Sequence, residues 1–219
     1  MVKESELWPK VEKFVKSHFG CFVTEIDKGL MEFGKPDVAG VKRFIKDEGS
    51  TNEVIVVEVK NGSSGFCKKV GQALGYSIFA HRCYLAVYFK NREKFSEDQK
   101  SLANKLGVGL IEIRKNCREI LTSPFHEPME HFLLPFIDKL GVAKCVICNN
   151  FFEIKSQVLC REDSIESRNK SLQKAINKDK SYKYFLFNLA NEIMDKRSYV
   201  YTSRCICSDC IKLFGKGMS

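Results

Sequence analysis

The sequence predicts an α/β fold in which helices cover a mixed β-sheet, followed by a smaller, mainly helical zinc-binding domain. Three observations lead to this prediction. Apolar runs of strand length alternate with segments of helical period over the first 113 residues. One run, residues 53–60 with the sequence EVIVVEVK, is almost continuously β-branched, as strands buried on both faces are. Two Cys-x2-Cys pairs then lie towards the C-terminus.

The elements are expected in the order α-β-β-β-α-β-α-β. Apolar residues at helical spacing indicate a first helix from Ser5 to Gly20, and a hairpin of two strands, 21–26 and 36–45, follows around a glycine-containing loop. The β-branched strand 53–60 should be central in its sheet. The other expected elements are a helix at 67–80, a strand at 84–89, a helix at 96–106 and a strand at 108–113.

The composition is that of a globular, basic protein: 219 residues, 44% of them hydrophobic, with a net charge of +9. This length suffices for one or two domains with a real core, which excludes disorder as the main state. No apolar run has the roughly 18 to 20 residues of a membrane helix, and residues 1–6 are too polar for a secretory signal. We expect an intracellular protein, cytoplasmic or nucleoid-associated, and the positive charge favours nucleic acid as a partner.

Charged side chains interrupt the apolar strand 53–60 at its C-terminal end. The two-residue period of a strand places Glu58 and Lys60 on the same face, where they can simply form an ion pair. A functional interpretation needs a second carboxylate nearby, and Asp37 supplies one at the start of the preceding strand. A divalent cation held by two carboxylates stabilises negative charge and lowers the pKa of bound water, as phosphodiester hydrolysis requires.

These residues resemble a known signature. Pro36-Asp37, followed by Glu58-Val59-Lys60, is similar to the motif of the PD-(D/E)XK nuclease superfamily, and Gln72 and Tyr76 match the Gln-x-x-x-Tyr that many relatives carry on the following helix. The resemblance covers residues 5–113. It implies a restriction-endonuclease-like αβββαβ core and a Mg²⁺- or Mn²⁺-dependent deoxyribonuclease of the endonuclease type. DNA is then the expected substrate, and cleavage of a duplex would favour a homodimer.

The resemblance also implies roles for individual residues. Asp37 and Glu58 would hold the metal, together with the main-chain carbonyl of Val59. Lys60 would orient or deprotonate the attacking water and offset charge on the phosphate. Gln72 would contact the strand backbone or the water network, whereas Tyr76 is equally a core aromatic.

Many relatives carry an additional acid before the Pro-Asp. Glu12 and Glu25 are the alternatives in this chain, and hairpin geometry favours Glu25. Lys68 and Lys69 open the helix after the loop 61–65, which makes them weak predictions for phosphate contacts.

The cysteine pairs predict a structural zinc site. Cys145, Cys148, Cys207 and Cys210 have the spacing that lets two pairs of thiolates bind one tetrahedral Zn²⁺. Four sulfurs complete the coordination shell, so no position remains for catalytic water. Phe151 and Phe152 indicate a knuckle and hairpin after the first pair, an arrangement that resembles a treble-clef module. Cys205 is an alternative ligand to Cys207.

Three domain segments follow from these assignments. Pro124, Pro128 and Pro135 mark the boundary after a nuclease-like domain at 1–122, with a Pro-containing linker or helix at 123–142 and the zinc-binding domain at 143–219. A helical insertion at 163–195 would separate the two cysteine pairs. His126 and His131 are expected to be solvated linker residues rather than ligands of a second site. A non-catalytic nucleic-acid-binding or scaffolding protein on the same fold, working through its zinc module, is the alternative function.

Overall fold

The computed structural model describes residues 2–30, 33–46, 49–90, 93–145, 148–153, 207, 209 and 210. The chain divides into two compact units, Met1–Leu140 and Gly141–Ser219, and each is considered by itself. None of the helices in the described part of the chain is both long and apolar enough to cross a lipid bilayer.

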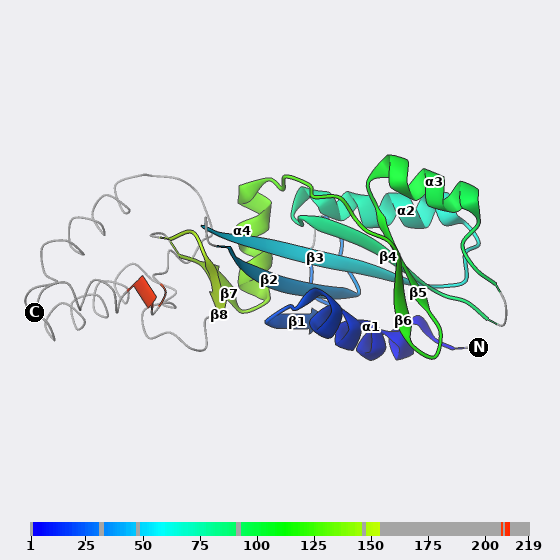
Figure 1. Cartoon of the computed structure of the whole chain (residues 1–219), viewed down its shortest axis with the longest axis horizontal. Helices are drawn as coiled ribbons and strands as arrows, with labels where there is room; N and C mark the ends of the chain where they lie inside the picture. The colour runs from blue at the N-terminus through cyan, green and yellow to red at the C-terminus, as the bar shows by residue number, and fades with distance from the viewer. Residues whose placement is uncertain are drawn as a thin grey trace, which may run out of the picture. The chain divides into compact units, whose positions relative to one another are not determined.

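The first unit is built on a six-stranded mixed sheet with the strand order β1-β2-β3-β4-β5-β6 (Figure 1). The pairs β1–β2, β2–β3 and β5–β6 are antiparallel, whereas β3–β4 and β4–β5 are parallel. The strands are β1 (Val23–Ile26), β2 (Val38–Lys46), β3 (Gly49–Asn61), β4 (Arg82–Tyr88), β5 (Gly109–Ile113) and β6 (Cys117–Leu121). The predicted mixed sheet is therefore confirmed, with β1 and β2 as the expected hairpin.

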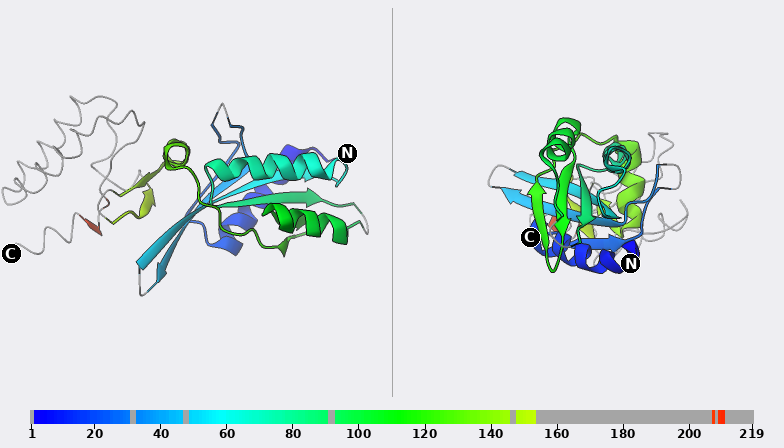
Figure 2. Two further views of the ribbon diagram at one scale, coloured as in Figure 1. Left: turned by 90° about the horizontal axis from the view of Figure 1, so that it is seen from above. Right: turned by 90° about the vertical axis from the view of Figure 1, so that its right-hand side faces the viewer.

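Helices cover both faces of this sheet, so that the unit has three layers when it is viewed along the strands (Figure 2). Helix α1 (Glu4–Phe19) lies on one face, and α2 (Phe66–Gly75) and α3 (Glu97–Leu106) lie on the other. Helix α4 (Glu130–Lys139) packs Phe136 against Phe79, with ring centroids 4.5 Å apart. The strand β3 is consequently covered on both sides, and Val54, Val56 and Val57 are fully buried, as its β-branched sequence predicts.

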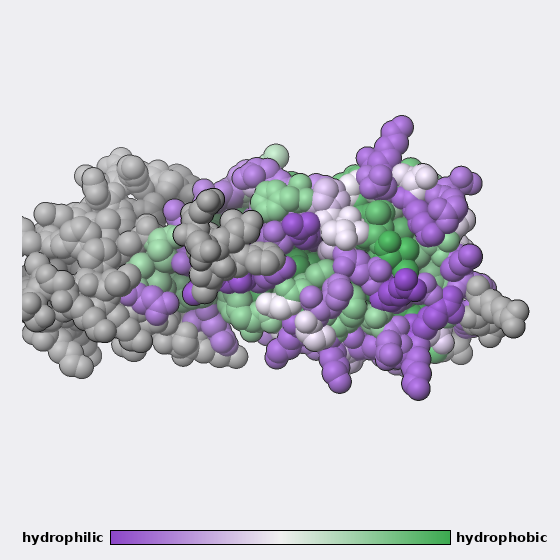
Figure 3. Space-filling model, viewed as in Figure 1, coloured by the Kyte–Doolittle hydropathy of each residue, from purple (hydrophilic) through white to green (hydrophobic). Residues whose placement is uncertain are grey.

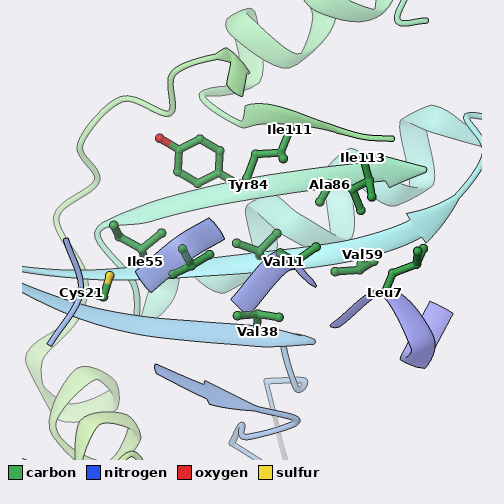
Figure 4. Close-up of a cluster of buried hydrophobic side chains, with 12 residues drawn as sticks. Leu7, Val11, Cys21, Val38, Ile55, Val59, Tyr84, Ala86, Ile111 and Ile113 are labelled. Carbon is green, nitrogen blue, oxygen red and sulfur yellow. The ribbon is translucent and has the colours of Figure 1, made fainter. Parts of the chain in front are cut away.

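The face towards α1 carries one of the two apolar clusters. Leu7, Val11 and Val15, which recur at helical spacing, pack from α1 onto Ile55 and Val59 of β3 (Figure 4). Each such side chain contributes about 1.5 to 3 kcal/mol when it is fully buried. The opposite face of α1 is hydrophilic, and Figure 3 shows such side chains along the lower margin of the molecule, where α1 lies. The helix ends at Gly20, whose φ of 71° is readily adopted only by glycine.

One helix and one strand differ from the sequence prediction. The helix expected at 67–80 is an α-helix only to Gly75 and continues as a 3-10 turn, η1 (Tyr76–Ile78). The 3-10 turn redirects the chain, and Tyr76 is buried at its start. Strand β6 was not predicted, because its sequence CREIL is short and half polar, as is typical of an edge strand.

The described part of the second unit contains a small antiparallel hairpin. Strands β7 (Val142–Lys144) and β8 (Phe151–Glu153) pair in the register Lys144 opposite Phe151. The hairpin flanks the first cysteine pair, as the sequence indicates for a zinc knuckle. The predicted helical insertion at 163–195 lies outside the described residues.

Candidate functional site

The predicted acidic residues meet at the carboxyl end of β3. Glu58 and Lys60 lie two residues apart on this strand, and Lys60 Nζ is 2.5 Å from Glu58 Oε1. Asp37 directly precedes β2, the antiparallel neighbour of β3. Its Oδ2 atom accepts a hydrogen bond of 2.6 Å from the backbone N–H of Val59, the residue between Glu58 and Lys60 in the sequence.

Pro36, in the Pro-Asp dipeptide, cannot donate a hydrogen bond to the strand residue that faces it. The β2–β3 register sets Val38 opposite Val57, so Pro36 falls opposite Val59 when the register is continued. Proline has no N–H and cannot donate to the carbonyl of Val59. Because the N–H and C=O of a strand residue point to the same neighbouring strand, the Val59 carbonyl faces the side of Asp37. Two carboxylates and one carbonyl thus offer oxygen atoms on adjoining strands.

Tyr76 fixes the carboxylate of Glu58 from the other side. Its hydroxyl donates to Glu58 Oε2 at 2.7 Å, and Glu58 is only 2% exposed. The Tyr76 hydroxyl is also 3.2 Å from the carbonyl oxygen of Lys35, and Gln72 Nε2 donates to it at 3.3 Å. The Tyr76 ring packs against Gly34, where a Cβ atom would lie 3.1 Å from it. Tyr76 therefore ties Glu58 to the chain segment that leads into Asp37.

A third carboxylate, which the sequence analysis did not identify, joins this cluster from α1. Glu4 Oε2 lies 3.5 Å from Lys60 Nζ, and Glu4 Oε1 accepts a hydrogen bond of 3.1 Å from the backbone N–H of Asn61. Acidic residues are common in the first turn of a helix, where the helix dipole favours them, so Glu4 gave no separate signal. Its position beside Lys60 follows only from the way α1 packs across the sheet.

Burial and neighbouring charges shift the pKa values of the site residues. Burial, reinforced by the nearby charge of Glu58, raises the pKa of Asp37 from 3.8 to about 7. Burial lowers the pKa of Lys60, but its hydrogen bond with Glu58 and the surrounding carboxylates outweigh this effect and raise it above its usual value. Burial and the hydrogen bond to Glu58 likewise raise the pKa of Tyr76. Burial is the leading cause of the shifts of Asp37 and Tyr76, and the charge of Glu58 adds to both.

The alternative acids lie apart from these contacts. Glu25 lies opposite Ala39 in the β1–β2 register. Ala39 follows Asp37 by two residues, so Glu25 lies on the same face of the sheet as Asp37. Its proposed contribution stays a prediction. Glu12 accepts a hydrogen bond of 3.1 Å from Thr24 Oγ1 instead.

The two lysines at the start of α2 have different surroundings. Lys68 is exposed, whereas Lys69 Nζ donates to the carbonyl of Gly62 at 2.8 Å. Burial and the charge of Lys60 lower the pKa of Lys69. Lys68 is thus more accessible to a phosphate than Lys69. A phosphate contact stays a prediction for both lysines.

The four predicted cysteines form a compact cluster in the second unit. The Sγ atoms of Cys145, Cys148, Cys207 and Cys210 all lie within 4.8 Å of one another. The Cys145–Cys210 and Cys148–Cys207 Sγ distances are 3.8 Å and 3.7 Å. A tetrahedron with metal–sulfur bonds of about 2.3 Å has edges of about 3.8 Å, so this spacing fits a tetrahedral ion such as Zn²⁺. Cys205 lies outside the described residues.

The two histidines near the prolines have contacts of another kind. His126 Nε2 is 2.8 Å from the carbonyl oxygen of Gly107, and the ring of His131 lies 4.0 Å from that of Phe132. Among the described residues, the four cysteines are the His, Cys, Asp or Glu side chains that lie close enough together, in a group of three or more, to share one metal ion. Neither histidine belongs to this group.

Comparisons with known proteins add little to this geometry. No family model matches the sequence, and no curated protein matches it. A protein of unknown function from Silicibacter pomeroyi has a similar solved structure, with 18% sequence identity and a TM-score of 0.44, over 64% of this chain and 84% of that one. The side chains described above are therefore the basis for assigning a function.

Proposed function

We propose that this protein is a divalent-metal-dependent nuclease that hydrolyses phosphodiester bonds of DNA, as its resemblance to the PD-(D/E)XK superfamily implies. The observation that carries the proposal is the meeting of Asp37 and Glu58 beside Lys60 at one strand end. The family core that the resemblance implies also has a hairpin leading into the strand with the Glu-x-Lys. An internal cut, made by an endonuclease, is the reaction that we expect.

The donor set fits Mg²⁺ or Mn²⁺. Both are hard cations that take oxygen ligands, and Mg²⁺ commonly uses one or two carboxylates and keeps several waters. Asp37 and Glu58 would supply the carboxylates and Val59 its carbonyl. The raised pKa of Asp37, which comes from burial and from the nearby charge of Glu58, supports this assignment, because perturbed carboxyls of this kind are frequent at functional sites. When bound, the ion would polarise the phosphate and lower the pKa of water.

The protein side chains would contribute charge and orientation. Lys60, held 2.5 Å from Glu58, presents an ammonium group that can orient a water molecule and offset charge on the phosphate. Tyr76 acts on the site through Glu58, since its hydroxyl donates to Glu58 Oε2 and fixes the carboxylate. Gln72 in turn donates to Tyr76 and is itself exposed, so it can reach a bound strand.

The second unit would serve a structural role. Four sulfur ligands complete a tetrahedral shell, which leaves Zn²⁺ no open position for chemistry. The β7–β8 hairpin and the cysteine knuckle support a treble-clef-like module, and in that case zinc contributes folding free energy to a unit with a modest core. The module would position substrate or partner.

The decisive experiment measures cleavage of labelled linear, circular, branched and single-stranded DNA, and of RNA, with and without Mg²⁺ or Mn²⁺. Cutting of circular DNA identifies an endonuclease. Asp37→Asn, Glu58→Gln and Lys60→Met should each abolish cleavage and remain folded. Lys105→Met and Glu97→Gln, which remove exposed charges on α3, are the matched controls and should retain full activity. Full activity in Asp37→Asn would exclude this site as the catalytic centre.

A non-catalytic nucleic-acid-binding protein is the second candidate. The observation that favours it is the ion pair of Lys60 with Glu58, which satisfies both groups within the fold. Such a protein would bind DNA in EDTA as tightly as in Mg²⁺ and cut none of the substrates. A nuclease would instead bind in Ca²⁺ and cut in Mg²⁺.

A further inference from the structure

A cleft of about 490 Å³ lies at the carboxyl ends of β3 and β4, next to the proposed catalytic cluster. Its walls include Glu4, Asn61, Gly62, Tyr88, Lys90 and Glu93. Glu4 belongs to both places, because its carboxylate lines the cleft and also lies 3.5 Å from Lys60 Nζ. A molecule in the cleft would therefore be an immediate neighbour of the group that is bound at Lys60.

The chemistry of the walls selects the kind of group that fits. Tyr88 is half-buried: part of its ring packs against the apolar cluster under α1, and the rest lines the cleft. Asn61 adds an amide, anchored by a hydrogen bond of 2.7 Å from its Nδ2 to the carbonyl of Val2. An aromatic face beside an amide is the combination with which proteins bind an unstacked nucleobase.

The charges of the walls argue against a phosphate in the same place. Glu4 and Glu93 both line the cleft, and carboxylates repel a phosphate group but not an uncharged base. Lys90 is exposed at the cleft, where it can neutralise a phosphate of the flanking backbone. The scissile phosphate would then lie at Lys60 and its neighbours, and the base next to that phosphate would enter the cleft.

We infer that this cleft is a nucleobase subsite, in which Tyr88 stacks on the unpaired base next to the scissile phosphate. The inference rests on the proposed nuclease function and names its substrate class. A base inside a duplex cannot enter such a cleft unless it is unpaired and unstacked, which costs a few kcal/mol. Single-stranded, frayed or branched DNA is consequently the preferred substrate.

An abasic scan tests the subsite directly. Single-stranded DNA, end-labelled and carrying one abasic position that is moved along the strand, is digested in Mg²⁺, and every cut is quantified. The cut beside the abasic position should be suppressed by about 5- to 150-fold, because base–aromatic stacking is worth about 1 to 3 kcal/mol. Cuts elsewhere in the same strand serve as the internal reference.

Variants identify the ring responsible. Tyr88→Leu keeps apolar packing but cannot stack, so the suppression should disappear and all cuts should weaken alike. Tyr88→Phe should retain the suppression, as should Phe125→Ala, which removes a 51% exposed aromatic next to His81, at the start of β4. An even cleavage ladder for the wild-type protein would overturn the subsite and leave the nuclease standing. Absence of cleavage in every strand would overturn both.

Discussion

Replacing Asp37 with asparagine should stabilise the metal-free protein above pH 7 while removing its response to Mg²⁺. The pKa of this carboxyl rises from 3.8 in the unfolded chain to about 7 in the fold, chiefly through burial and the charge of Glu58. This difference in pKa corresponds to about 4 kcal/mol, the amount by which the ionised form of Asp37 lowers the free energy of unfolding. Asp37 is partly exposed, so screening by water reduces the expected effect to about 2 kcal/mol.

The dependence on pH has a definite sign. Between about pH 4 and pH 7 the unfolded chain has lost the Asp37 proton and the folded protein still holds it, so the free energy of unfolding falls as the pH rises. Above pH 7 both states are ionised, and the full cost persists. Asparagine removes this cost and still offers an oxygen to the N–H of Val59. The stabilisation should therefore be about 2 kcal/mol at pH 8 and under about 1 kcal/mol at pH 5.

Urea denaturation in EDTA at pH 5 and pH 8, repeated at pH 8 with Mg²⁺ in place of EDTA, measures these differences. If Mg²⁺ binds the folded state at this site as proposed, it should stabilise the wild-type protein and leave Asp37→Asn almost unchanged. Asp98→Asn makes the same chemical change at an exposed position on α3 and should stay within about 0.5 kcal/mol. The reasoning fails if Asp37→Asn is no more stable than wild type at pH 8, or if Mg²⁺ stabilises both proteins equally.

Three further changes test other parts of the structure. Tyr76→Phe should lower stability by about 1.5 to 3 kcal/mol in urea denaturation and weaken Mn²⁺ binding, because Glu58 loses a buried donor; unaltered Mn²⁺ affinity would contradict its positioning role. Gly71→Ala should raise stability by about 1 kcal/mol, since no atom lies within 4 Å of the added Cβ, and a loss would mean that α2 is distorted. Elemental analysis should find one zinc per chain, and a chelator should expose residues 141–219 to protease before residues 2–140; substoichiometric zinc with an unchanged digest would refute the zinc site.

The sheet and the centre of the candidate site follow from local sequence. A β-branched run such as Val54–Val57 is stable in the middle of a covered sheet. The sequence alone therefore predicts the position of this strand and of Glu58 and Lys60 at its end. The cysteine spacing is equally direct, because two Cys-x2-Cys pairs need only come together to complete a tetrahedron. These features are encoded within a few residues each.

The features that escaped prediction depend on contacts between distant segments. Glu4 reaches Lys60 across 56 positions of sequence, and nothing around Glu4 distinguishes it from the other acids of α1. The motif names Tyr76 and leaves a core role equally open, and only the fold shows the contacts that its hydroxyl makes with Glu58 and the carbonyl of Lys35. Strand β6 exists because Ile113 and its neighbours on β5 offer an unpaired edge, a property of the sheet rather than of residues 117–121.

A structural ion pair and the proposed metal site require different balances of charge at the end of β3. A structural ion pair needs one carboxylate for its ammonium, and Glu58 alone would satisfy Lys60. Here Glu4 and Asp37 are added. Burial, with a smaller contribution from the charge of Glu58, raises the pKa of Asp37 to about 7, and Lys60 does not offset this rise. Replacing Asp37 by a neutral group should then stabilise the metal-free fold, and the proposed function accounts for the carboxyl as a metal ligand. A divalent cation would restore the balance of charge, whereas an additional lysine at this position would compete with it.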